Sequence, residues 1–194
     1  VVSTLVITYK NTKINEINVY GTEISLESVL KNEYGLELFI NHLYKEYNIE
    51  LITSYIEVNY LLGKLTKLNA GMNIQDKYIE TFHDGISDII VRKDEYISGK
   101  YKDVNSGDLP TVLQLHCVII YNKYISEYGE FTINISHELR NLADNMIQND
   151  GININNTDDN IKLFDLFYDI KQEMRKMLAF SFKRFKNNDD FAKI

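Results

Sequence analysis

Four histidines and one cysteine are the side chains of this sequence best suited to metal binding or nucleophilic catalysis. They are scattered along the chain, as His42, His83, His116, His137 and Cys117. No two histidines stand four residues apart, the spacing that brings two imidazoles to one metal ion on a helix. Cys117 follows His116 directly, and adjacent helical residues point away from each other, so they form no catalytic dyad. We expect no metal site and a core position for Cys117.

The other polar residues give no pattern typical of catalysis. The acid pairs Asp158-Asp159 and Asp189-Asp190 fall at expected helix ends, where carboxylates cap helices or are solvated. The segment GKLTKLNAG lacks the spacing and strand context of a phosphate-binding loop. No serine lies in a nucleophile-elbow motif. We therefore expect a protein without catalytic residues of its own and without a cofactor.

The composition of the 194 residues indicates an acidic globular domain. Hydrophobic residues make up 44% of the chain and charged residues 25%, which is ample for a buried core. A net charge of −7 has the wrong sign for neutralising phosphates, so we expect no nucleic-acid partner. The single cysteine fits a reducing, cytoplasmic setting. No apolar run approaches the roughly 20 residues that span a bilayer.

Residues 1–24 precede the first helical pattern and are expected to form an arm or linker. Their opening run, VVSTLVITYK, favours a terminal strand or arm docked on the core. The end of a membrane-spanning helix is the alternative. The chain starts at Val1 without a methionine, so we expect it to be part of a longer protein.

Apolar residues recur at helical spacing from Ser25, which is the expected N-cap of a first helix that stops at Gly35. The same spacing predicts a second helix over 36–48 and a third over 52–63. Residues 63–110 contain most of the glycines and a higher charge content. We interpret them as an insertion with one or two helices of its own, because a structureless loop of that length is unusual.

Three more helices are predicted after the insertion. Pro110 opens the first, over 111–125, and Ser136 caps the second, over 137–148. Leu139, Leu142, Ala143 and Met146 are expected on one apolar face of the second. Thr157 or Asp158 caps the last and longest. Its apolar stripe consists of Phe167, Ile170, Met174, Met177, Ser181 and Phe185. No sustained period-two alternation occurs after the N-terminal arm, so the predicted fold class is all-α.

Three stretches, in the same order as in the family, resemble the regulator of G-protein signalling (RGS) domain. The first is SLESVLKNEYGLELFINHLYKEYNIELITSY at 25–55, similar to the family's helices two to four. The second is IIYNKYISEYGEFTINISHELR at 119–140, similar to the fifth helix and the loop to the sixth. The third is LFDLFYDIKQEMRKMLAFSFKRFKNNDDF at 163–191, similar to the terminal pair of helices. The resemblance covers most of 25–194 apart from the insertion.

This resemblance implies a nine-helix bundle in which helices four to seven form an antiparallel subdomain. It also implies a partner, the GTP-bound α subunit of a heterotrimeric G protein, whose GTP hydrolysis such domains accelerate. They supply no catalytic side chain; they hold the switch segments of the α subunit in the arrangement of the transition state. The chain is then expected in the cytoplasm, at the inner face of the plasma membrane through its partner, with any other membrane association provided by flanking regions.

The resemblance also implies which residues contact the α subunit. They are Glu46, Tyr47, Glu50, Leu51, Asn134, Phe180, Ser181 and Arg184. Two of them depart from the family pattern. Leu51 aligns with an Asn that touches the region of the catalytic Gln, and Phe180 aligns with an Asp that binds the switch backbone. Leu offers no donor or acceptor, and loss of the Asp removes charge-assisted hydrogen bonds.

Two alternatives to GTPase activation follow from these departures and from the fold class. An RGS-homology docking module would bind a signalling partner without activating it, with Phe180 as an aromatic anchor. A helical domain that only self-associates would leave Glu46, Asn134 and Arg184 dispensable. The sequence favours activation because Glu46, Asn134, Ser181 and Arg184 match the family.

Overall fold

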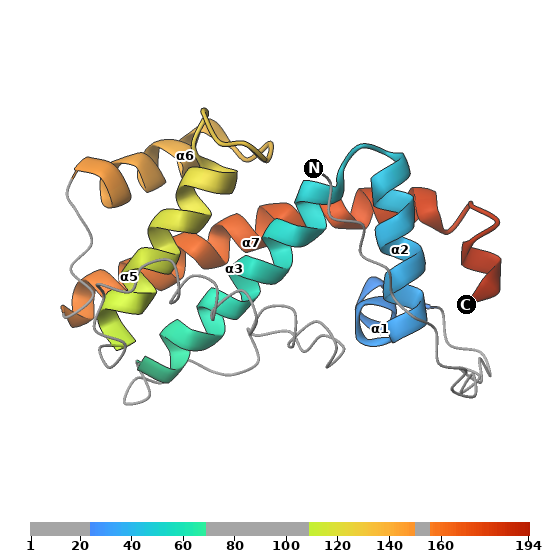
Figure 1. Ribbon diagram of the computed structural model, residues 1–194, viewed down its shortest axis with the longest axis horizontal. Helices are drawn as coiled ribbons and strands as arrows, with labels where there is room; N and C mark the ends of the chain where they lie inside the picture. The colour runs from blue at the N-terminus through green and yellow to red at the C-terminus, as the bar shows by residue number, and fades with distance from the viewer. Residues whose placement is uncertain (1–23, 69–108, 150–155) are drawn as a thin grey trace, which may run out of the picture.

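The computed structural model describes residues 24–68, 109–149 and 156–194, which form helices and connections (Figure 1). Helix makes up 80% of this described part, and no strand occurs in it, so the predicted all-α class is confirmed there. Residues 1–23 of the expected arm lie outside the described ranges, as do the helices expected inside the insertion. None of the described helices is both long enough and apolar enough to cross a lipid bilayer.

The described part contains six α-helices and three short helical turns. The α-helices are α1 (Leu26–Lys31), α2 (Glu33–Lys45), α3 (Ile49–Leu68), α5 (Leu109–Ile120), α6 (His137–Asp144) and α7 (Thr157–Phe185). The π-helical turns η2 (Tyr121–Ile125) and η3 (Asn145–Asn149) extend α5 and α6. A 3₁₀ turn, η4 (Phe191–Lys193), lies at the C-terminal end.

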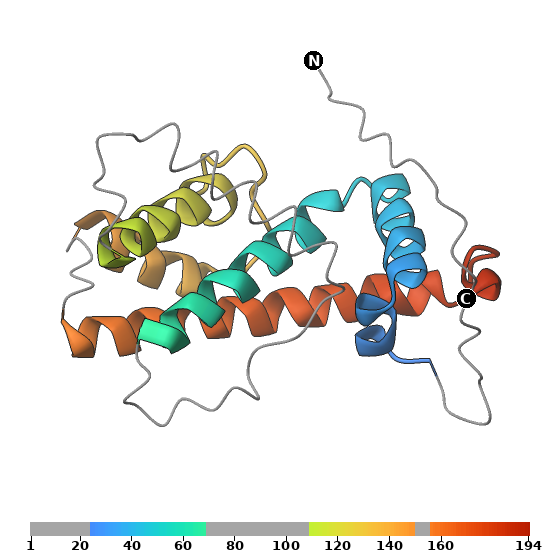
Figure 2. The ribbon, with the colours of Figure 1, turned by 60° about the horizontal axis from the view of Figure 1, so that its bottom comes forward.

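Helix α7 runs the length of the molecule, and the other helices are arranged along it (Figures 1 and 2). Helices α2, α3 and α6 pack on α7, and the contact of α3 with α7 is the most extensive of the three. Helix α5 packs on α3, and α1 packs on α2. The colour sequence in Figure 1 shows that α3, α5, α6 and α7 alternate in direction. The core is therefore shared between two groups, α1 and α2 at one end of α7, and α3, α5 and α6 along the rest.

Helix α7 is a single helix where the resemblance implied a terminal pair. No glycine or proline occurs from Thr157 to Phe185, so nothing in the local sequence breaks the hydrogen-bond ladder. The expected apolar stripe is confirmed: five of its members are buried and Met177 is half-buried. Its N-cap is Asn156, whose Oδ1 accepts from the Asp158 N–H at 3.0 Å, rather than Thr157 or Asp158 as expected.

The start of the first helix is confirmed, but its end is not where we expected it. Ser25 caps α1 in a reciprocal capping box with Ser28. The break after α1 lies at Asn32, whose Oδ1 accepts the Gly35 N–H at 2.7 Å and caps α2. Gly35 therefore belongs to the first turn of α2 and does not stop α1. The side-chain cap at Asn32 stabilises the break between the two helices more than a glycine would.

Two further expectations are corrected by packing. Helix α3 does not fade at Gly63; it continues to Leu68 because Leu61, Leu62 and Leu65 extend its buried face and are fully covered. On α6, Leu142 was expected on the apolar face but is 46% exposed, since the short helix buries only Ala143 and Arg140. The starts of α5 near Pro110 and of α6 after Ser136 agree with the sequence patterns.

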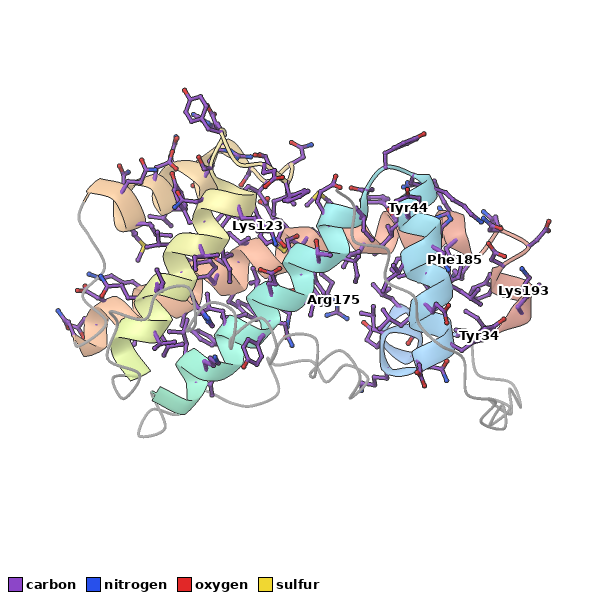
Figure 3. All side chains as sticks on the ribbon, viewed as in Figure 1. Tyr34, Tyr44, Lys123, Arg175, Phe185 and Lys193 are labelled. Atoms are coloured by element: carbon purple, nitrogen blue, oxygen red, sulfur yellow. The ribbon has the colours of Figure 1, made fainter. Side chains whose placement is uncertain are left out.

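The joint between α2 and the end of α7 is held by aromatic rings packed at tilted and edge-to-face angles, and its strength can be measured. Phe185 is fully buried, points toward α2 (Figure 3), and lies 5.4 Å from both the Phe39 and the Phe191 ring. Phe185→Ala is expected to lower the free energy of unfolding by about 3–5 kcal/mol, because it leaves a cavity. Urea denaturation followed by circular dichroism measures this loss.

The matched control is Phe180→Ala on the same helix, since Phe180 is 68% exposed. It is expected to change the free energy of unfolding by no more than about 0.5 kcal/mol. Equal effects of the two substitutions would contradict the packing described for this joint.

Candidate protein-binding site

The connection from α2 to α3 is a tight turn made of Glu46, Tyr47 and Asn48. The Glu46 N–H donates to the His42 carbonyl at 3.1 Å, and the Asn48 N–H donates to the Leu43 carbonyl at 2.9 Å. Tyr47 has a φ of 54°, in the left-handed region that few residues other than glycine adopt. Its side chain is 92% exposed. The turn thus projects Tyr47 away from the core.

An ion pair joins this turn to the last turn of α7. The Arg184 guanidinium donates from Nε to Glu46 Oε1 at 2.5 Å and from Nη2 to Oε2 at 2.7 Å, a bidentate contact. Nη2 also donates to Ser181 Oγ at 3.0 Å, and Ser181 is only 1% exposed. Three of the expected site residues, from positions up to 138 residues apart, therefore form one network.

The electrostatics of this network keep it charged at neutral pH. The hydrogen bonds from Arg184 hold the pKa of Glu46 below its ordinary value of 4.5, against the opposing effect of burial. The same contacts raise the pKa of Arg184. Because the Arg184 side chain is 56% exposed, the pair fixes geometry more than it adds stability.

Exposed aromatic side chains flank the ion pair. Tyr44 is 71% exposed, Tyr47 92% and Phe180 68%. Phe180 stands one helical turn before Arg184 and thus on the same side of α7. We call these three residues the aromatic rim. Large aromatic side chains left in water beside an ordered ion pair are typical of protein-binding surfaces.

The loop between η2 and α6, residues 126–136, carries Asn134 and has a fixed backbone. Arg140, 8% exposed, donates from Nη2 to the Ile133 carbonyl at 2.9 Å and from Nη1 to the Ile125 carbonyl. Ile133 and Ile135 are buried on either side of Asn134, which is exposed. Asn134 is therefore presented to solvent by a loop whose neighbouring side chains are anchored in the core.

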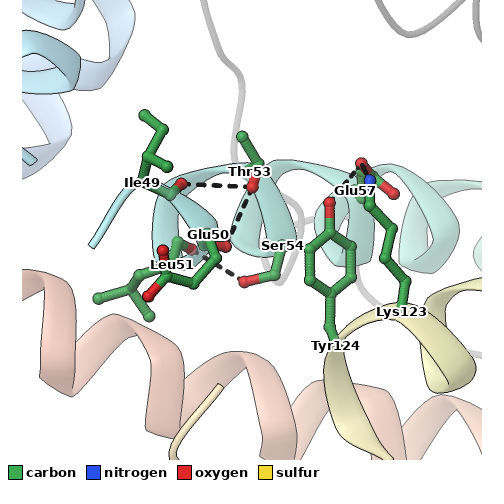
Figure 4. A network of polar contacts seen from close by, with 8 residues as sticks. All are labelled: Ile49, Glu50, Leu51, Thr53, Ser54, Glu57, Lys123 and Tyr124. Carbon is green, nitrogen blue, oxygen red and sulfur yellow. Dashed lines mark hydrogen bonds and ion pairs between the residues drawn. The ribbon is translucent and has the colours of Figure 1, made fainter. Parts of the chain in front are cut away.

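Polar contacts from α3 and α7 hold both ends of this loop. The Tyr124 hydroxyl donates to Glu57 Oε1 at 2.7 Å, and Lys123 Nζ lies 3.1 Å from the same oxygen (Figure 4). Burial and the Glu57 charge raise the pKa of Tyr124, so the hydroxyl keeps its proton. At the other end, the Ser136 N–H donates to Glu173 Oε2 at 2.7 Å.

The remaining expected contact residues lie in the first turn of α3. Glu50 is half-buried there, and in the described part of the chain its carboxylate is not paired with Arg184. Leu51 is 2% exposed and belongs to the hydrophobic core, on the side of α3 that faces α7 (Figure 4). The Leu51 side chain thus contributes to the packing of α3.

Two residues of this region were not identified from the sequence. Asn48, half-buried, directly precedes α3, and its side-chain amide makes no hydrogen bond within the described residues. It is the only amide in the turn, three positions before Leu51. The very short connection between α2 and α3 is the feature of the sequence that could have identified Asn48. It moves the alignment with the family from Leu51 to Asn48. Tyr44 was missed because an aromatic at helical spacing is usually a core residue.

The described residues contain no group of three or more His, Cys, Asp and Glu side chains that could hold a metal ion. Cys117 is fully buried, and burial raises the pKa of its thiol, which makes it unreactive. His116 is also buried, whereas His137 is exposed and contacts Asn141 at 3.1 Å.

Comparisons of the chain with models of known protein families, with curated proteins and with solved structures found no match.

The loop that presents Asn134 depends on the small size of Gly129. A Cβ added at Gly129 would lie 2.8 Å from the Lys123 carbonyl oxygen and 2.9 Å from that of Asn122. Gly129→Ala is therefore expected to displace the loop and to lower the free energy of unfolding by about 1–3 kcal/mol. Thermal unfolding and the amide resonances of residues 123–135 report the two effects.

Gly35→Ala is the control, because its Cβ would meet only ordinary contacts at 3.4 Å or more. Within α2 this change is expected to be neutral or stabilising, by up to about 1 kcal/mol. A Gly129→Ala protein with unchanged stability and unchanged amide resonances would refute the fixed loop.

The Glu46–Arg184 pair can be tested by a double-mutant cycle with Glu46→Gln and Arg184→Met. We expect a coupling free energy of about 0.5 kcal/mol at pH 7, typical of an exposed pair. Because the pKa of Glu46 is lowered in the folded protein, this stabilisation is present above the ordinary pKa of 4.5 and is lost as the pH falls below it. Urea denaturation at pH 7 and pH 3 measures the cycle, and an unchanged coupling at pH 3 would rule out the ion pair.

Proposed function

We propose that this chain is an RGS-type domain that binds the activated α subunit of a heterotrimeric G protein and accelerates its GTP hydrolysis. The observation that carries the proposal is the network of Glu46, Ser181 and Arg184. The resemblance named these residues as partner contacts from distant parts of the sequence, and they share hydrogen bonds of 2.5–3.0 Å at one surface.

Two features of the fold support the same proposal. The turn between α2 and α3 and the loop between η2 and α6 lie on the same side of the molecule in both ribbon views (Figures 1 and 2). The alternating directions of α3, α5, α6 and α7 are those of an antiparallel subdomain. A nine-helix bundle of the RGS type, divided by an insertion within 63–110, is part of the proposal.

The mechanism requires only binding. The α subunit has its own catalytic Arg and Gln and hydrolyses GTP unaided at roughly 10⁻² s⁻¹. A domain that binds the switch segments more tightly in the transition state than in the ground state raises this rate. The ion pair and the anchored loop suit such a role, because side chains ordered before binding cost less entropy when the complex forms.

Within this proposal, Asn48 is a better match than Leu51 for the family Asn that approaches the catalytic Gln region. Leu51 is buried, while the amide of Asn48 lies in the turn and makes no hydrogen bond to the residues that the structure describes. The partner contacts proposed are then Glu46, Tyr47, Asn48, Glu50, Asn134, Phe180 and Arg184. Ser181, which is 1% exposed, supports them by accepting a hydrogen bond from Arg184.

A second candidate function is a docking module that binds its partner without activating it. The aromatic rim favours this candidate, because Phe180 replaces the family Asp and offers an apolar surface where charge-assisted hydrogen bonds are needed for activation. Exposed aromatic side chains are frequent binding hot spots.

Single-turnover hydrolysis of GTP preloaded on α subunits from the same cell, with and without the domain, tests the proposal. We expect acceleration, and a loss of roughly tenfold or more with Asn134→Ala or with Glu50→Lys, because each leaves partner groups unpaired or repelled. Asp169→Lys, a charge reversal at an exposed position in the middle of α7, is the control and is expected to retain full activity.

Binding to the GDP–aluminium fluoride form of the α subunit separates the candidates. Binding of this transition-state mimic with acceleration supports an activator, and binding without acceleration supports a docking module. Absence of both, with every α subunit of the cell, would overturn the proposed partner. Self-association that survives Asn134→Ala and Glu50→Lys would then indicate the third alternative.

A further inference from the structure

His42 is a polar side chain enclosed by aromatic rings next to the candidate site. It lies on the last turn of α2 and is 6% exposed. Its ring stacks on Phe39 at a centroid distance of 6.3 Å and lies 5.2 Å from Phe185. A phenylalanine would satisfy these contacts, so packing alone does not require an imidazole. Burying a polar ring in such a pocket costs free energy unless it has a polar partner.

The polar partner that His42 faces is the carboxylate of Glu46. Nε2 lies 3.3 Å from Glu46 Oε1, which is an ion-pair distance, but the geometry is not that of a hydrogen bond. Nε2 is buried and has no hydrogen-bond partner within the described residues. Glu46 Oε1 is also the oxygen that Arg184 Nε contacts at 2.5 Å. One carboxylate is thus approached by His42 from α2 and by Arg184 from α7.

Among the residues that the structure describes, Glu46 is the charged side chain within ion-pair distance of the His42 ring. Arg184 contacts the same carboxylate and is linked to His42 through it. From α7, the ring faces the apolar Phe185. Lys45, the neighbouring cation on α2, pairs with Asp190 at 2.9 Å. The local net charge of His42, Glu46 and Arg184 is therefore zero when the imidazole is neutral and +1 when it is protonated.

We propose that His42 is a positioning residue that makes the candidate site sensitive to protons. With a neutral imidazole, Glu46 is held by Arg184 alone, and its carboxylate is available to a basic segment of the partner. When His42 takes up a proton, it gains a charge-assisted contact to Glu46 Oε1. The carboxylate is then shared between two cations, and the site repels a basic partner segment. Histidine is the side chain that ordinarily changes charge between pH 5 and 8.

The effect on binding rests on the proposed function, but the coupling within the chain does not, so two experiments are needed. The first uses the chain alone. The Arg184 Nε–H and Glu46 carboxyl resonances are followed by NMR from pH 8 to pH 5.5. We expect both to shift along with the His42 ring resonances, and to stay constant over that range in His42→Phe, which keeps the aromatic packing. Constant resonances in the unmodified chain, or equal shifts in His42→Phe, would overturn the inference.

The second experiment measures the affinity for the GDP–aluminium fluoride form of the α subunit at pH 7.5 and pH 6.0. We expect the affinity of the unmodified chain to fall roughly three- to tenfold more than that of His42→Phe, as one added charge near the interface implies. His42→Gln, polar but not titratable, should behave like His42→Phe. His137→Asn, at the exposed histidine of α6, should retain the pH dependence of the unmodified chain.

The outcomes separate this inference from the proposed function. No binding by any variant at either pH removes the proposed partner, and the NMR titration alone then decides the role of His42. Binding with the same pH dependence in all variants contradicts the proton-sensitive site. Thermal unfolding of His42→Phe and His42→Gln confirms that each is folded under the conditions used.

Discussion

The structure depends on α7 remaining one uninterrupted helix, because elements along its whole length are attached to it. Near its middle, Glu173 accepts the N–H of Ser136 and thereby fixes the start of α6. Two residues further, Arg175 pairs with Glu27 of α1. At the last turn, Arg184 binds the turn that follows α2. A break in α7 would therefore separate the loop that carries Asn134 from the ion pair that orders Glu46.

The interior between α3 and α7 shows how strongly this helix is fixed. Lys171 is 1% exposed, and its Nζ donates to Asn59 Oδ1 at 2.6 Å. The same ammonium group lies 5.6 Å from the centre of the Tyr55 ring. A buried cation tolerates only a narrow set of positions, because its desolvation must be compensated by specific partners. Such a contact fixes the register of α7 against α3, which apolar packing alone specifies less sharply.

How much of this fold the sequence predicts depends on whether the signal is local. The caps at Ser25 and Ser136 predicted the starts of α1 and α6 correctly, since a cap is a property of a few adjacent residues. The helix ends predicted at Gly35 and Gly63 were wrong. A glycine ends a helix only where no neighbouring cap and no buried face stabilises the helical backbone through it. For the site, the resemblance named Glu46, Ser181 and Arg184, which the fold joins. Composition and spacing could not pair residues so far apart in the sequence.

The errors at the site share one physical cause. Leu51 was expected to contact the α subunit and is buried, because it lies on the side of α3 that packs on α7. His42 was considered only as a metal ligand, although a single histidine can act on a carboxylate four residues ahead on the same helix. In both cases the decisive information is which side of a helix faces α7. Identical residue types in a different register would give a surface leucine and a solvated histidine, so the chemistry of this site follows from the packing of α2 and α3 against α7.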